Sequence, residues 1–104
     1  MPDTQQFVKP QELDTYDKVR ETLVNTVLEK TLHSAGIYHT MTSEIKKTYN
    51  CNLYDCYKHP EYFSSILESR HGEMYDLVVG AINKQLEMFS YEKPIARFLQ
   101  AISP

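Results

Sequence analysis

The sequence predicts an all-α protein, organised as a single compact bundle of four to five helices in antiparallel pairs. Apolar residues recur every three or four positions through most of the chain, which is the period of an amphipathic helix. No segment alternates apolar and polar residues for long enough to indicate a strand. The breaks between the periodic segments are short, and short connections place consecutive helices next to each other.

Length and composition are those of one ordinary globular domain. A chain of 104 residues buries roughly two-thirds of its unfolded surface, which is enough for a core without disulfides or metals. The 41% hydrophobic and 24% charged residues are typical of globular proteins. We interpret residues 1–9 as a flexible lead-in and residues 10–104 as a single helical domain.

The net charge and the hydropathy of the chain limit which partners it can bind and where in the cell it can be located. The net charge is −3, and the basic pair Lys46-Lys47 lies beside Glu44. Binding to nucleic acid requires a basic face, so we expect no nucleic-acid partner. No apolar run approaches the length of a membrane span. The N-terminal MPDTQQF is too polar for a secretory signal, so we expect a cytoplasmic protein that does not enter a membrane.

The first helix is expected over residues 10–33, because Pro10 suits a first helical turn. Its apolar positions cover an arc of roughly 220°, against the ~100° stripe of a surface helix, so one neighbour could not bury them all. These positions are Leu13, Tyr16, Val19, Leu23, Val24, Val27, Leu28 and Leu32. Gly36 then suits the left-handed position that ends a helix.

A narrow apolar line at i, i+4 spacing predicts a second, surface helix over residues 37–49. The connector that follows, residues 49–61, reads YNCNLYDCYKHPE. Asn50 and Asn52 favour turns there, and Asp55 offers a carboxylate to exposed backbone N–H groups. We expect Leu53, a lone apolar residue, to anchor the connector to the core.

Three more helices are expected after the connector, over residues 60–70, 73–89 and 92–102. The first and last carry narrow apolar faces. The middle one has a wide apolar arc, so we expect it to be the central, covered helix. The positions of this arc are Met74, Leu77, Val78, Ala81, Ile82, Leu86 and Phe89. Gly80 lies inside it at a cost of about 1 kcal/mol relative to Ala, which predicts a close packing contact there.

The connector also holds the only candidates for chemistry. Cys51, Cys56 and His59 are the ligand types of a zinc site, but the paired spacing of zinc knuckles is absent, so we expect no metal and no cofactor. A disulfide is disfavoured inside cells. Cys56, His59 and Asp55 supply the residue types of a nucleophilic triad, which leaves a small metal- or thiol-dependent enzyme as the weakest alternative.

Tyrosine is the unusual residue of this chain, with eight copies, four of them around the connector. Tyr is enriched in protein interfaces, so Tyr54 and Tyr57 are candidates for contact with a partner. The alternative is that these side chains line the rim of the core with their hydroxyls in water.

The segment from Gly36 to Leu86 resembles the Nitrosopumilus output domain, a small archaeal family. The resemblance lies in GIYHTMTSEIKKTYN, in Leu53 and Asp55 of the turn, in HPEYFSSIL and in RHGEMYDLVVGAINKQL. It implies a helical regulatory output module with no assigned reaction and no functional residue to transfer. The chain departs from the family in Cys51, Cys56 and its tyrosine-rich turn.

We therefore expect a small non-catalytic regulatory or protein-interaction domain with an unidentified protein partner. A helix-turn-helix DNA-binding regulator is the alternative, although the connector is longer than the usual turn of that motif. Two wide apolar arcs are difficult to cover in one small bundle, which predicts an exposed apolar face and a homodimer. The residues expected to face the partner copy on the first helix are Leu13, Val24, Leu28 and Leu32.

Overall fold

The computed structural model describes the backbone of residues 10–104 and the side chains of residues 16–104. Over this range it contains helices and loops and no strand, which confirms the all-α fold class. The lead-in expected over residues 1–9 lies outside the described residues. The α-helices are α1 (Pro10–Ala35), α2 (Tyr38–Tyr49), α3 (Pro60–His71), α4 (Tyr75–Leu86) and α5 (Lys93–Ile102). Short 3₁₀ helices are η2 (Leu53–Tyr57), η3 (Gly72–Met74) and η4 (Glu87–Phe89).

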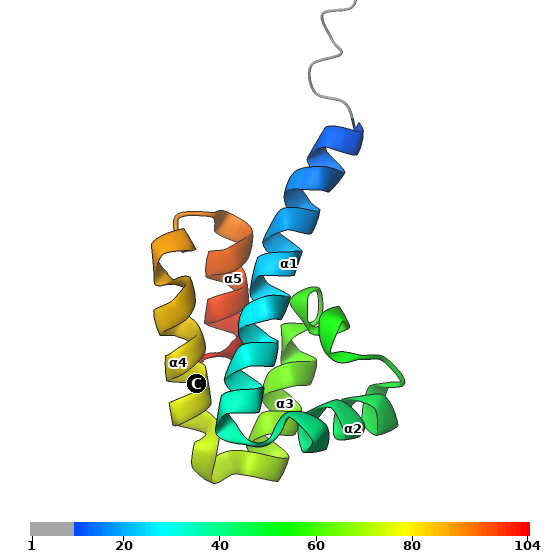
Figure 1. Ribbon diagram of the computed structural model, residues 1–104, viewed down its shortest axis with the longest axis vertical. Helices are drawn as coiled ribbons and strands as arrows, with labels where there is room; N and C mark the ends of the chain where they lie inside the picture. The colour runs from blue at the N-terminus through cyan, green and yellow to red at the C-terminus, as the bar shows by residue number, and fades with distance from the viewer. Residues whose placement is uncertain (1–9) are drawn as a thin grey trace, which may run out of the picture.

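The helices pack around α1, which is much longer than the others (Figure 1). α4 lies beside α1 and runs in the opposite direction, and α5 returns antiparallel to α4. α3 packs against both α2 and α5. α1 and α4 run antiparallel to each other, as do α4 and α5, whereas α2 lies across the end of α1.

The helix ends follow the turn chemistry of the sequence. Gly36 adopts a left-handed φ of 76°, as expected after the end of α1. Asn50 does the same at the end of α2, with a φ of 55°. The rings of His33 and Tyr38 stack across the Gly36 turn with centroids 3.9 Å apart, so they join the end of α1 to the start of α2.

The connector is an ordered element built on a capping box. The Asn52 side chain accepts from the Tyr54 backbone N–H at 3.1 Å, and the Asp55 carboxylate accepts from the Asn52 N–H at 3.0 Å. Leu53 is buried as predicted, with Cys56 beside it in the core. Pro60 takes a first-turn position of α3, where its missing N–H has no cost.

The core confirms the narrow apolar faces predicted for the helices that became α2, α3 and α5. It also buries the C-terminal part of α1. The core residues are Val24, Val27, Leu28, Leu32, Ile37, Met41, Ile45, Leu53, Cys56, Phe63, Ile66, Leu67, Val78, Val79, Ile82, Leu86, Ile95, Phe98, Leu99 and Ile102.

Two expectations about the wide helices are wrong. α4 is not the covered helix, because Leu77 on its outer side is 68% exposed. Gly80 is exposed as well, and a Cβ added there would meet nothing within 4 Å, so it makes no packing contact. α4 lies at the edge of the molecule, and α1 takes the covered position instead.

Candidate functional site

The two cysteines of the connector lie in different environments. Cys51 is half-buried and Cys56 is fully buried, and both thiols are free. Burial raises the pKa of Cys56 to about 12 and raises the pKa of Cys51 as well. A thiol that stays protonated inside the core is a poor nucleophile and a poor metal ligand. Cys56 is therefore a core side chain in this fold.

His59, the third candidate ligand, points to its own neighbours. Its Nδ1 lies 3.5 Å from the Glu61 carboxylate, and its ring stacks on Tyr62 with centroids 4.7 Å apart. Among the side chains that the structure describes, no group of three or more His, Cys, Asp or Glu residues is placed to hold a metal ion. Asp55, the third residue of the candidate triad, accepts the Asn52 N–H in the capping box.

The connector tyrosines divide into two kinds. Tyr49 stacks on Tyr62 with centroids 3.9 Å apart and planes 10° from parallel, which fastens the end of α2 to the start of α3. Tyr57 is half-buried against Phe98. Tyr54 is 46% exposed, and its hydroxyl donates to Glu29 Oε2 at 2.6 Å. Of the two tyrosines expected at an interface, Tyr54 is accessible and Tyr57 lines the rim of the core.

The apolar residues expected to face a partner copy on α1 are not accessible. Val24, Leu28 and Leu32 are fully buried, so that expectation is wrong. α4, α2, the connector and α5 surround this part of α1 and remove the need for a partner. The side chain of Leu13 lies outside the described residues. The exposed apolar side chains of α1 are instead Tyr16 and Val19 in its projecting part.

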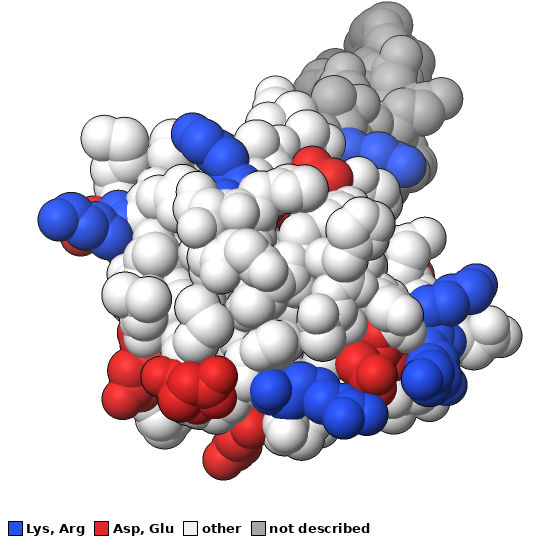
Figure 2. Space-filling model, turned by 60° about the horizontal axis from the view of Figure 1, so that its bottom comes forward, with Lys and Arg blue, Asp and Glu red and all other residues white. Residues whose placement is uncertain are grey.

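A different apolar surface lies where α1 ends and α4 begins. Figure 2 views this end of the molecule and shows a broad uncharged face with acidic and basic side chains at its borders. A shallow groove of about 230 Å³ lies between the two helices. Its lining is almost entirely apolar: Thr31, Ser34, Ala35, Leu77, Val78 and Ala81.

Local structure explains why this groove stays open. Ala35 and Ala81 are small, and α1 ends at Ala35, so no further turn covers the start of α4. The two helices are held together by a hydrogen bond from Gln85 Nε2 to Thr31 Oγ1, 2.8 Å long. Thr31 is the buried polar residue of this region, and this bond satisfies it.

Leu77 is the functional candidate that sequence periodicity missed. Its apolar character placed it on the inward arc of its helix, together with the residues that are buried. A signal was present in the neighbouring positions, because Gly80 and Lys84 follow Leu77 at i+3 and i+7 on the same helical face. A glycine and a lysine beside a leucine indicate a face open to solvent.

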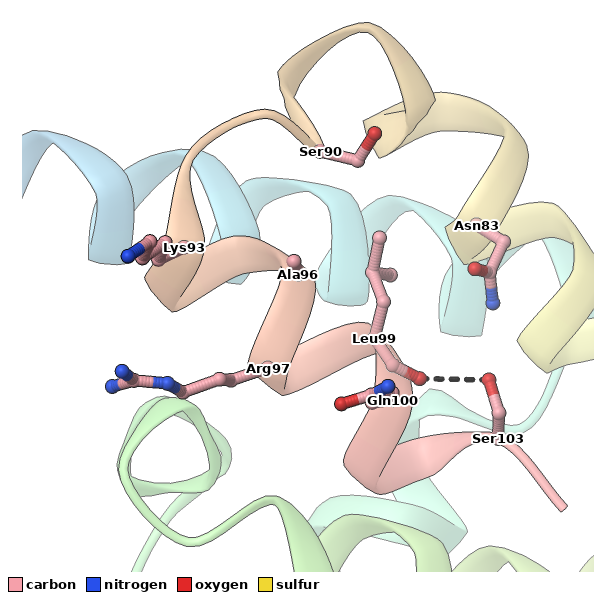
Figure 3. A pocket seen from close by; sticks show the side chains of 8 residues that line it. All are labelled: Asn83, Ser90, Lys93, Ala96, Arg97, Leu99, Gln100 and Ser103. Atoms are coloured by element: carbon pink, nitrogen blue, oxygen red, sulfur yellow. Dashed lines mark hydrogen bonds between the residues drawn. The ribbon is translucent and has the colours of Figure 1, made fainter.

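A second groove lies between α4 and α5 and has a different chemistry (Figure 3). It encloses about 450 Å³, and an adjoining hollow of about 500 Å³ shares three of its residues. Leu99 projects between the two helices, while the Lys93 and Arg97 side chains extend to the same side. The groove residues are Asn83, Ser90, Lys93, Ala96, Arg97, Leu99, Gln100 and Ser103.

The chain matches no protein-family model, no curated protein and no solved structure. The resemblance to the Nitrosopumilus output domain accordingly stays a prediction. Within the described residues, no helix is long and apolar enough to cross a membrane. The helix-turn-helix alternative also stays untested; α2 and α3 are separated by residues 50–59, which contain η2.

Proposed function

We propose that this protein is a non-catalytic regulatory domain of the cytoplasm that binds a protein partner through Leu77 and the apolar groove beside it, called here the Leu77 face. The observation that carries the proposal is the 68% exposure of Leu77 beside an apolar groove. A large exposed apolar side chain next to an apolar hollow is a candidate association site.

The shape of the groove supports a particular kind of contact. A volume of about 230 Å³ suits one or two apolar side chains of a partner, inserted between Leu77 and the end of α1. Interface energy is concentrated in a few such anchors, which are buried in pockets and surrounded by weaker contacts.

A second copy of the chain is one candidate for the partner. A homodimer was expected through the apolar residues of α1. We now place its contact at Leu77, because Leu77 is accessible and Leu28 is not. Light scattering on the purified protein separates the two forms of the proposal. A concentration-dependent mass of two chains, reduced to one by Leu77→Glu, supports a dimer through this face, and a constant single-chain mass assigns it to another protein.

Capture of partners by three matched proteins tests the function itself. The wild type, Leu77→Ser and the control Val19→Ser are immobilised, and retained proteins from the source cells are quantified by mass spectrometry. Val19 is 61% exposed and lies on the projecting part of α1, so its replacement removes similar apolar area elsewhere. A partner retained by wild type and Val19→Ser but lost by Leu77→Ser supports the proposal. Equal retention by all three contradicts it.

A further inference from the structure

We propose that the groove between α4 and α5 is a second binding site, one that accepts an acidic segment of a protein. This site is separate from the Leu77 face and does not depend on it. Its cationic edge consists of Lys93 and Arg97, and its floor is Leu99 with Ala96 beside it. A segment with spaced carboxylates and small apolar side chains complements both features.

The free charges of the groove are the first support. The chain has three arginines, and two of them form ion pairs: Arg20 Nε with Glu92 at 2.8 Å and Arg70 with Glu44 at 3.0 Å. Neither Arg97 nor Lys93 forms a salt bridge or a hydrogen bond with any side chain that the structure describes. Neither cation thus has an ionic partner among the described side chains. Arg97 also lines a second hollow, together with Asp17 and Tyr57.

The geometry of α5 directs these charges to one edge. Lys93 and Arg97 are four residues apart on one helix, so they lie one turn from each other on the same face. Figure 3 shows both side chains extending in the same direction, outward from the border of the groove and away from Asn83. Two cations at this spacing match carboxylates that are likewise separated along a peptide, and an Arg guanidinium can bind a carboxylate with two parallel hydrogen bonds.

The polar residues on the other side leave few free donors. Ser90 Oγ donates to the Glu87 carbonyl at 2.8 Å, and Ser103 Oγ donates to the Leu99 carbonyl at 2.7 Å. Asn83 Nδ2 donates to the Val79 carbonyl at 3.0 Å. These three donors are already used within the chain. Anionic groups of the ligand are thereby directed to the Lys93 and Arg97 edge.

The same charges argue for a peptide over nucleic acid. A polyanion requires a broad basic surface to offset the repulsion of an acidic protein. Two cations at one edge of a groove, with Glu87 lining the adjoining hollow, give no such surface. An acidic peptide has a lower charge density, and its apolar side chains gain from contact with Leu99 and Ala96.

Fluorescence anisotropy with a labelled peptide tests this site. The probe is a short fluorescein-labelled peptide of alternating Glu and Leu, and a matched peptide with Gln in place of Glu is the uncharged reference. Lys93→Gln and Arg97→Gln are compared with Lys46→Gln, which removes an exposed lysine of α2 outside the groove. Circular dichroism checks that each variant remains folded.

We expect the Glu peptide to bind at low salt and the Gln peptide to bind much more weakly. Lys93→Gln and Arg97→Gln should each raise the Kd by about fivefold, the upper range for one accessible ion pair. Lys46→Gln and Leu77→Ser should leave the Kd unchanged, which separates this site from the Leu77 face. Equal binding of both peptides, equal effects of all three charge variants or no binding of the Glu peptide would overturn the proposal.

Discussion

α1 and α4 have similarly wide apolar arcs in the sequence, and the fold treats them differently. The C-terminal part of α1 is surrounded by α2, the connector, α4 and α5, and its apolar residues there are fully buried. α4 packs mainly against α1 and α5 and leaves Leu77 exposed. An apolar arc thus shows how much surface a helix can bury, and the topology decides how much of it is covered. The uncovered remainder on an edge helix is available to a partner.

The two helices also differ in length, and this limits the cover that α1 receives. α1 has 26 residues and α4 has 12, which correspond to roughly 39 and 18 Å. The N-terminal part of α1 projects past its neighbours (Figure 1), and Tyr16 and Val19 are exposed there.

The largest expected difference between the two helices is in the cost of removing a leucine. Leu28→Ala on α1 should lower the free energy of unfolding by about 3–5 kcal/mol, because it leaves a cavity in a fully packed core. Leu77→Ala on α4 should change it by less than about 0.5 kcal/mol, as is usual for exposed positions. Urea denaturation of both variants measures this. Similar costs at the two positions would show that α4 is covered after all.

The connector covers one side of α1, and a second variant tests how firmly. Leu53 is 2% exposed, so Leu53→Ala should cost roughly 2–3 kcal/mol, below the value at Leu28 because a short connector can relax around the cavity. Tyr54→Ala is the control, with an expected loss under about 1 kcal/mol from its exposed hydrogen bond to Glu29. A denaturation midpoint unaffected by Leu53→Ala would show that the connector is loosely attached.

The buried thiol of the same connector predicts a pH dependence. Folding raises the pKa of Cys56 from the ordinary value of 9.0 to about 12. Between these values the unfolded chain releases the proton and the folded chain keeps it, so stability falls as pH rises, by about 1.4 kcal/mol per pH unit at most. Cys56→Ala should therefore lose less stability than wild type between pH 9 and pH 11. Identical slopes in the two proteins would contradict the burial of this thiol.

The smallest effect is expected on the open face of α4 and has the opposite sign. Gly80 lies inside a helix with ordinary φ, and a Cβ there meets no atom within 4 Å. Gly80→Ala should raise the free energy of unfolding by about 0.5–1 kcal/mol through the lower entropy of the unfolded chain. Thermal denaturation measures it. A loss of stability would mean that another backbone packs closely on this position.

Local signals in the sequence were enough to predict the helices. They did not predict the burial of side chains that depends on how neighbouring helices pack. Pro60, Gly36 and Asn50 mark helix boundaries by their own backbone preferences, and the structure places boundaries there. The burial of Leu53 followed from its being the one aliphatic residue in a polar turn. The exposure of Leu77 did not follow from periodicity, because it depends on which helix lies at the edge. Tertiary packing, and not the sequence of any one helix, decides which helix lies at the edge.

The two candidate binding surfaces could not be predicted from the sequence for the same reason, because each combines residues of two helices. The spacing of Lys93 and Arg97 is enough to place them on one face of a helix. The groove beside them also needs residues of α4, and it forms because the chain reverses direction after η4 and packs α5 against α4. The groove at Leu77 joins Ala35 to Ala81, residues far apart in the sequence. Periodicity within one helix has no information about such pairs.

Photo-crosslinking from position 77 tests the central claim, that the Leu77 face binds a protein. A photoreactive phenylalanine analogue is introduced at Leu77 and, in separate proteins, at Val19 and Tyr91, which are 61% and 77% exposed. After irradiation in the source cells, we expect one discrete crosslinked product from position 77 and none of that mass from the two control positions. No product from position 77, or the same product from all three positions, would contradict the claim.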